Sequence, residues 1–97
     1  MIPRTLLTLS LLLGVPAWAQ APDANLLAGA CAGCHGVSGQ GGHGIPSIRQ
    51  TQNIVEFISA MQAFGANRRE ATVMGRISRG YSEAEIAALA RFYARAQ

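Results

Sequence analysis

The segment CAGCH occupies residues 31–35, and its two cysteines, Cys31 and Cys34, are the only ones among the 97 residues. Two cysteines with this spacing, followed at once by a histidine, are compatible with three chemistries: a redox-active disulfide, a zinc site or a covalently attached haem. The choice among them decides the fold, because a chain of this length has room for little other chemistry. The surrounding sequence discriminates among the three.

The context of the motif disfavours a disulfide enzyme and a zinc site. In a thiol–disulfide oxidoreductase, C-x-x-C opens a helix packed on a sheet, whereas residues 26–32 are good helix formers and no segment alternates as a strand does. Structural zinc takes four ligands in a tetrahedron. The adjacency of Cys34 and His35 makes their joint ligation of one ion awkward. A disulfide oxidoreductase and a zinc-binding interaction module therefore stay as alternatives of other classes.

C-x-x-C-H is the attachment signature of c-type haem. The two thiols add to the two vinyl groups of the porphyrin, and the next residue on the same helix end places an imidazole beneath the iron. The sequence therefore predicts one haem c held covalently by Cys31 and Cys34, with His35 as an axial ligand of the iron. A covalent cofactor would also stabilise a domain so small that its protein core alone is marginal.

The N-terminal residues resemble an export signal: Arg4, an apolar run from Thr5 to Val15, and Ala17-Trp18-Ala19. A basic start, a short apolar core and small residues at alternate positions form a secretory signal. We expect residues 1–19 to be a signal peptide cleaved after Ala19, and residues 20–97 to form the domain in the periplasm. An apolar run this short falls below the about 20 residues that span a bilayer. A retained N-terminal anchor is the alternative.

The charge pattern is less informative. The chain has a net charge of +3, and all eight of its basic residues are arginines. They form no block of five or six like charges, and they lack the interleaved aromatic residues on which nucleic-acid bases stack. Solvated surface charge is the favoured interpretation, and an acidic partner surface is compatible with it. The sequence does not favour nucleic-acid binding.

Periodicity predicts about three main helices and no strand, which defines an all-α domain. Asn25 is the expected N-cap of the first helix, whose body is residues 26–32. The segment GVSGQGGHG, residues 36–44, has five glycines in nine residues and predicts a loop that repeatedly adopts positive φ. Residues 66–73 are expected to be irregular or only briefly helical.

Capping boxes mark the starts of the other two helices, Asn53 with Glu56 and Ser82 with Glu85. Apolar residues at helical spacing follow each box: Ile54, Phe57, Ile58, Met61 and Phe64 in the first, and Ile86, Leu89, Ala90 and Tyr93 in the second. Each stripe predicts one buried helix face. Tyr81 and Ile86 have the spacing of a hydrophobic staple.

Three residues are candidates for the remaining axial position of the iron: His43, Met61 and Met74. His43 lies only eight residues beyond His35 in the glycine-rich loop, so reaching the opposite face of the ring would be difficult. Met61 lies on an apolar helix stripe and fits core packing. Met74 lies 39 residues after His35, beside a glycine in a predicted loop, from which a thioether can reach the iron. The sequence favours Met74, with a packing role as the alternative.

Pro46 is expected to assist the histidine, because its carbonyl can accept the ring N–H of His35 and fix the imidazole. A proline that only stiffens the loop is the alternative. Ligation of the iron by His35 and Met74 would leave no position for a substrate, so the chain alone is expected to pass single electrons and not to catalyse a reaction.

Several segments together resemble a small monohaem cytochrome c domain: CAGCHG, IPSI and RREATVMGRISRGYSEAEIAALARFYA. The run ATVMGRI…RGYSEAEIAALA is especially similar to the cytochrome subunits of flavocytochrome c sulfide dehydrogenases. The resemblance covers most of residues 26–95. The segment FGANRR, residues 64–69, departs from that pattern.

The resemblance implies a cytochrome c fold around one haem c, with thioether bonds from Cys31 and Cys34 and axial ligands from His35 and Met74. It also implies that Gly29 lies where the first and last helices cross. The implied partner is a flavin-binding subunit that oxidises sulfide and passes electrons to this haem. A free-standing carrier that serves an oxidase or another dehydrogenase is the alternative.

Overall fold

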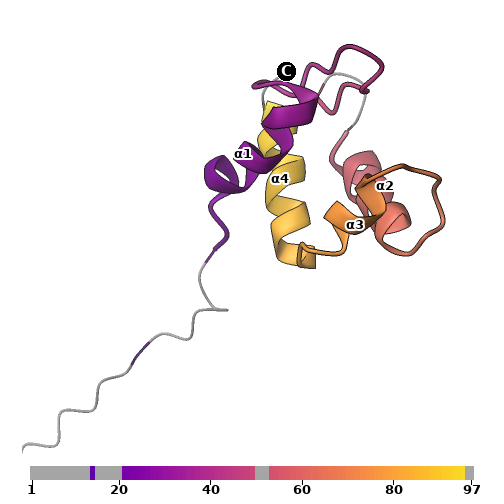
Figure 1. The fold of residues 1–97 in the computed structure, drawn as a ribbon. Coiled ribbons are helices and arrows are strands. Elements are labelled where there is room, and N and C mark those ends of the chain that lie inside the picture. The colour runs from indigo at the N-terminus through magenta and orange to yellow at the C-terminus, as the bar shows by residue number, and fades with distance from the viewer. Residues whose placement is uncertain (1–13, 15–20, 50–52, 96–97) are drawn as a thin grey trace, which may run out of the picture.

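The fold was examined in a computed structural model, which describes residues 14, 21–49 and 53–95 (Figure 1). Its helices are α1 (Ala24–His35), α2 (Ile54–Gly65), α3 (Met74–Ser78) and α4 (Glu83–Arg95). These described ranges contain no strand, only an isolated antiparallel bridge between Gly42 and Ile45. The all-α fold with three main helices is therefore confirmed. Apart from residue 14, the expected signal peptide lies outside the described residues.

Helix α4 is central to the arrangement, because it packs against both α1 and α2, while α3 packs against α2 (Figure 1). Its buried face carries Ile86, Leu89, Ala90 and Tyr93, which are between 0% and 5% exposed. Burying Leu89 or Tyr93 contributes about 1.5–3 kcal/mol each, as is usual for large side chains taken out of water. The apolar stripe predicted for this helix therefore faces the interior of the domain, as expected.

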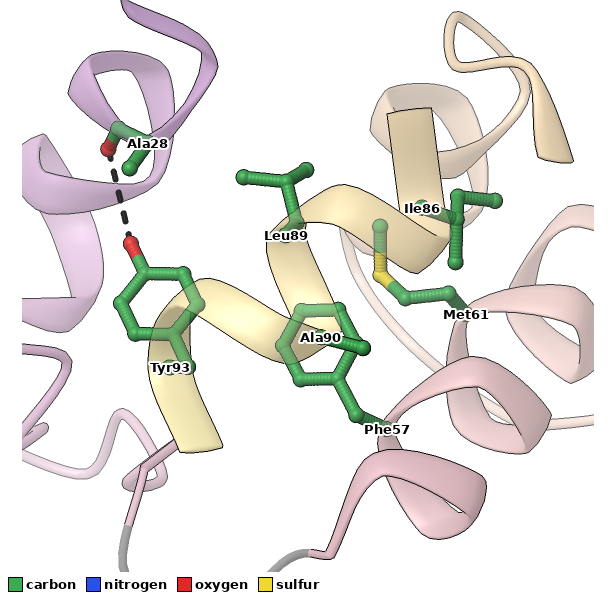
Figure 2. Packing of buried hydrophobic residues seen from close by; sticks show 7 residues of the cluster. All are labelled: Ala28, Phe57, Met61, Ile86, Leu89, Ala90 and Tyr93. Atoms are coloured by element: carbon green, nitrogen blue, oxygen red, sulfur yellow. Dashed lines mark hydrogen bonds between the residues drawn. The ribbon is translucent and has the colours of Figure 1, made fainter. Parts of the chain in front are cut away.

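The aromatic residues of α4 connect the two neighbouring helices (Figure 2). The Tyr93 ring stacks on Phe57 of α2 with 5.9 Å between ring centroids, and Phe92 meets it edge-on at 5.1 Å. The Tyr93 hydroxyl donates a hydrogen bond to the carbonyl oxygen of Ala28 in α1, at 3.5 Å. One side chain thus contacts both helices that flank α4.

Both predicted capping boxes are present. Asn53 Oδ1 accepts from the amide of Glu56 at 2.9 Å, and the Glu56 carboxylate accepts from the amide of Asn53 at 3.2 Å. At the start of α4, the Ser82 hydroxyl accepts from the amide of Glu85 at 3.1 Å, and the Glu85 carboxylate accepts from the amide of Ser82 at 2.9 Å. Each box satisfies two amides that the first turn of a helix leaves without partners.

The start of the first helix corrects a prediction. The N-cap of α1 is Asp23, not Asn25, which lies inside the first turn. Asp23 has extended backbone angles, and its carboxylate accepts from the amides of Asn25 at 3.1 Å and Leu26 at 3.3 Å. Both residue types can cap. Asp23 is favoured because a negative charge near a helix N-terminus is also stabilised by the helix dipole.

Two further expectations need correction. Met74 does not lie in a loop but is the first residue of the short helix α3. Gly29 is exposed, with open space where a Cβ would be, so it is not the point of close approach between α1 and α4. The neighbouring Ala28, which is 6% exposed and bound by Tyr93, occupies that contact. None of the helices in the described part of the chain is long and apolar enough to cross a bilayer.

Candidate functional site

The CAGCH motif forms the last turn of α1, which ends at His35. Cys31 lies three residues before Cys34 and four residues before His35. These spacings place Cys31 on the same face of the helix as each of the other two residues. Cys31 is half-buried and packs against the core, whereas Cys34 is exposed. No disulfide joins the two sulfur atoms. Two thiols and an imidazole are therefore presented by one helix end.

The glycine-rich segment after α1 is a hydrogen-bonded loop that returns the chain to this helix end. The amide of Gly41 donates to the carbonyl of His35 at 2.6 Å, and the amide of Ile48 donates to the carbonyl of Gly39 at 2.8 Å. Gly39 has a φ of 73°, and a Cβ there would lie 2.8 Å from the Tyr93 ring. The expected positive φ values are confirmed at Gly36, Gly39, Gly41, Gly42 and Gly44, and His43 adopts one as well.

This loop brings the carbonyl of Pro46 to the imidazole of His35, whose Nδ1 lies 2.8 Å from the carbonyl oxygen. A carbonyl oxygen can only accept, so Nδ1 carries the hydrogen and donates it. In the neutral ring, Nε2 is then left with the free lone pair that binds a metal. His35 is 8% exposed, so packing as well as this bond restrains the ring.

Cys31 lies beside the hydroxyl of Tyr93. Burial raises the pKa of the Cys31 thiol above its ordinary value, and a hydrogen bond with Tyr93 acts in the opposite direction. Burial is also the main cause that raises the pKa of Tyr93, so this hydroxyl stays protonated and available as a donor at physiological pH. The sequence gives no sign of this pairing, since Cys31 and Tyr93 lie 62 residues apart, on the first and the last helix.

The three candidates for the second axial ligand differ in their surroundings. His43 is exposed in the loop, and Met61 is buried in the core at 6% exposure, as the sequence analysis expected. Met74 is partly buried and packs against the edge of the core. It belongs to α3, which packs on α2, whereas His35 belongs to α1, which packs on α4. The two residues thus come from different sides of the helix assembly.

The residues around these positions fit an apolar, iron-containing group. Ile45 precedes Pro46, Val73 precedes Met74, and Ile77 lies one helical turn after Met74; the three are 37%, 54% and 41% exposed. Large apolar side chains gain free energy when they are covered, at roughly 25 cal/mol per Å². The donor set of two thiols, one imidazole with a free Nε2 and a thioether is that of a covalently attached haem.

The described residues do not bring together the ligands that a zinc site requires. Within residues 21–49 and 53–95, no group of three or more His, Cys, Asp or Glu side chains is placed to hold a metal ion. Tetrahedral structural zinc needs four such ligands.

A family model for cytochrome c matches residues 23–94. The chain belongs to the cytochrome c family. This cytochrome is also similar to the cytochrome subunit of sulfide dehydrogenase from Chlorobaculum tepidum, with 38% identity over 69 residues. That match covers 70% of this chain and 61% of the relative, so the chain spans less than two thirds of the relative's length.

Membership of the family settles the cofactor and the general activity. The protein carries covalently bound haem c and transfers electrons. The motif and Pro46 are recognisable from short-range patterns in the sequence. The contacts of Tyr93 with Cys31 and of Ser78 with Met61 were not predicted, because each joins residues that are far apart in the sequence and lie on different helices. The apolar periodicity of α4 was the only signal that Tyr93 faces inward.

Proposed function

We propose that this cytochrome c carries single electrons in the periplasm through a haem whose iron is ligated by His35 and Met74. Cys31 and Cys34 would hold the haem through thioether bonds, and Pro46 would orient His35. The bound haem supplies an iron that alternates between the ferric and ferrous states. With both axial positions filled by the protein, no substrate reaches the metal, so the chain alone has no catalytic role.

The hydrogen bond between His35 Nδ1 and Pro46 O is the observation that best supports this proposal. It assigns the ring hydrogen to Nδ1, which leaves Nε2 as the nitrogen that can bind a metal, and it restrains the ring next to the two cysteines. An imidazole that donates its other N–H to a carbonyl is a more basic ligand with a defined orientation. The loop therefore does more than link two helices, because it places the Pro46 carbonyl at hydrogen-bonding distance from the His35 ring.

Substitution of Met74 tests the axial ligation. We expect Met74→Ala to abolish the near-infrared thioether-to-iron band of the ferric protein, because alanine offers no ligand. The reduction potential should fall by on the order of 100 mV, within the ~0.8 V range over which axial ligands act. Absorption spectroscopy and a redox titration measure the two effects.

Met61→Leu is the comparison variant, because it removes the buried thioether of Met61 with little change in side-chain volume. We expect this variant to keep the band. If Met74→Ala retained the band and Met61→Leu lost it, the assignment of the two methionines would be reversed.

The proposed electron donor is a flavoprotein that oxidises sulfide, which the similarity to a sulfide dehydrogenase cytochrome subunit supports. A free-standing carrier for an oxidase or another dehydrogenase is the second candidate. Cleavage of residues 1–19 during export is part of the proposal. Purification of the protein from a periplasmic extract of its own host tests these points together. We expect a polypeptide that begins at Gln20 and co-elutes with flavin, whereas a haem protein without flavin would favour the free-standing carrier.

A further inference from the structure

A buried polar contact joins α3 to α2 away from the haem-attachment motif. The hydroxyl of Ser78, the last residue of α3, donates to the sulfur of Met61 in α2 at 3.5 Å. Ser78 is 3% exposed and Met61 is 6% exposed, so water does not compete for this pair. A buried hydroxyl needs a partner, and a thioether sulfur, although a weak acceptor, supplies one here.

Ser78 and Met74 lie on the same face of α3. They are the first and last residues of this five-residue helix and are four positions apart, a spacing that places side chains on one face. Met74 packs against the edge of the core, and Ser78 reaches Met61 within it. Any movement of Ser78 away from α2 would therefore also move Met74.

Helix α3 depends on α2 for its position. A helix this short is not stable by itself, and its N-cap residue, Val73, forms no side-chain capping bond. Gly75 allows close approach at the other end of the contact, since a Cβ there would lie 3.3 Å from the carbonyl oxygen of Phe64. The Ser78 hydroxyl supplies a directional bond across the contact between the two helices.

We propose that Ser78 is a positioning residue for Met74: its hydrogen bond to Met61 holds α3 on α2 and so keeps the Met74 thioether from being displaced. This inference rests on the proposed ligation of the iron by Met74. The two methionines then have separate roles. The sulfur of Met61 accepts a hydrogen bond in the interior, and the sulfur of Met74 is the proposed ligand of the haem iron. Ser78 itself contacts neither haem nor partner in this proposal.

Titration of the intact ferric haem protein with imidazole tests the proposal, because imidazole competes with the Met74 thioether for the iron. Loss of one hydrogen bond should weaken the hold on Met74, so we expect Ser78→Ala to bind imidazole roughly two- to tenfold more tightly than wild type. The near-infrared band reports the displacement. Urea unfolding of each variant is measured in parallel.

Ser82→Ala is the matched control for general destabilisation. It removes the side chain that caps α4 and should lower the unfolding midpoint by an amount similar to Ser78→Ala, while the Ser78–Met61 hydrogen bond stays in place. We expect its imidazole affinity to equal that of wild type. Ser59→Ala, at an exposed position of α2, controls for the serine-to-alanine change itself and should alter neither measurement.

A double-mutant cycle identifies the partner of Ser78. Met61→Leu leaves the buried Ser78 hydroxyl without its acceptor and should raise imidazole affinity at least as much as Ser78→Ala does. The double variant places two apolar groups in contact, which can be nearly neutral. We therefore expect its imidazole affinity to lie closer to wild type than that of Met61→Leu.

The possible outcomes separate this inference from the proposed ligation. The inference is overturned if Ser78→Ala changes imidazole affinity no more than Ser82→Ala does, or if the effects of the two substitutions at the Ser78–Met61 contact simply add. If Met74→Ala keeps the near-infrared band, the proposed ligation fails instead, and the inference fails with it. A band lost in Met74→Ala and unaffected imidazole binding in Ser78→Ala would leave the ligation intact and reject only the role of Ser78.

Discussion

The hydroxyl of Tyr93 is a single group that lies at the junction of the core and the haem-attachment helix. It donates to the carbonyl of Ala28 and lies beside the sulfur of Cys31, both in α1. The ring below it stacks on Phe57 in α2. Tyr93 therefore connects the helix that carries the haem-binding cysteines to the rest of the domain, and its polar and apolar parts can be tested separately.

Tyr93→Phe keeps the ring and removes only the hydroxyl. We expect the free energy of unfolding to fall by about 0.5–1.5 kcal/mol, the usual contribution of one hydrogen bond, with the haem spectrum unchanged. Urea denaturation at neutral pH measures the loss. Tyr81→Phe, at a partly buried tyrosine whose hydroxyl forms no hydrogen bond with the described residues, is the comparison. An equal loss in the two variants would contradict the role given to the Tyr93 hydroxyl.

The same variant should alter the response to alkaline pH. Burial raises the pKa of Tyr93 in the folded protein, whereas in the unfolded chain a tyrosine ionises near pH 10. Above that pH the folded state binds more protons at this residue, so the free energy of unfolding falls as pH rises. We expect this fall to be smaller in Tyr93→Phe than in wild type. Parallel curves between pH 9 and 11.5 would show that Tyr93 does not contribute.

At the scale of the helices, local sequence determines where α2 and α4 begin. Each has a reciprocal capping box, at Asn53 with Glu56 and at Ser82 with Glu85. Helix α3 has neither a capping bond nor the length to form alone. The boundaries of α2 and α4 are therefore properties of their own sequences, whereas α3 exists because α2 holds it.

The two capping boxes should differ in their effect on the whole domain. We expect Ser82→Ala to lower the free energy of unfolding by about 1 kcal/mol, because α4 packs against both α1 and α2. Asn53→Ala should have a similar local cost but should affect the region of α2 and α3 first. Hydrogen exchange distinguishes them: amides of α1 should lose protection in Ser82→Ala and keep it in Asn53→Ala. Equal loss in α1 would contradict the central place of α4.

Local patterns predicted the elements of this fold better than their contacts. The motif at residues 31–35, the glycine-rich loop and the capping boxes depend on neighbours within a few residues, and each was identified. Asn25 was the predicted N-cap of α1, and the prediction was wrong because Asn and Asp can both cap, while the extended backbone lies at Asp23. Ser78 could not be recognised, because its partner Met61 lies seventeen positions away on another helix.

At the scale of the whole molecule, the protein core is small for an independent domain. The buried apolar cluster consists of Ala28, Phe57, Met61, Ile86, Leu89, Ala90 and Tyr93. Ile45, Val73 and Ile77 remain outside it and substantially exposed. Small domains commonly rely on a covalent or bound group to complete their core, and the covalently bound haem c of this cytochrome is such a group.

Removal of the covalent attachment should therefore unfold the domain. We expect the double variant Cys31→Ala, Cys34→Ala, produced without haem, to show no cooperative urea transition by far-UV circular dichroism. Alanine is a better helix former than cysteine, so a loss of structure could not be attributed to helix propensity in α1. A cooperative transition with the wild-type slope would show that the helices fold without the cofactor.

The central position of α4 also has a consequence for the order in which this protein can be made. α1 and α2 leave the ribosome first, yet each packs on a helix that follows both of them in the chain. The nascent polypeptide therefore has no interior to complete until α4 has been synthesised. For a chain that is threaded unfolded through a translocation channel, as export would require, this delay is an advantage. If the chain is exported as proposed, haem attachment to the end of α1 would then begin on the far side of the membrane.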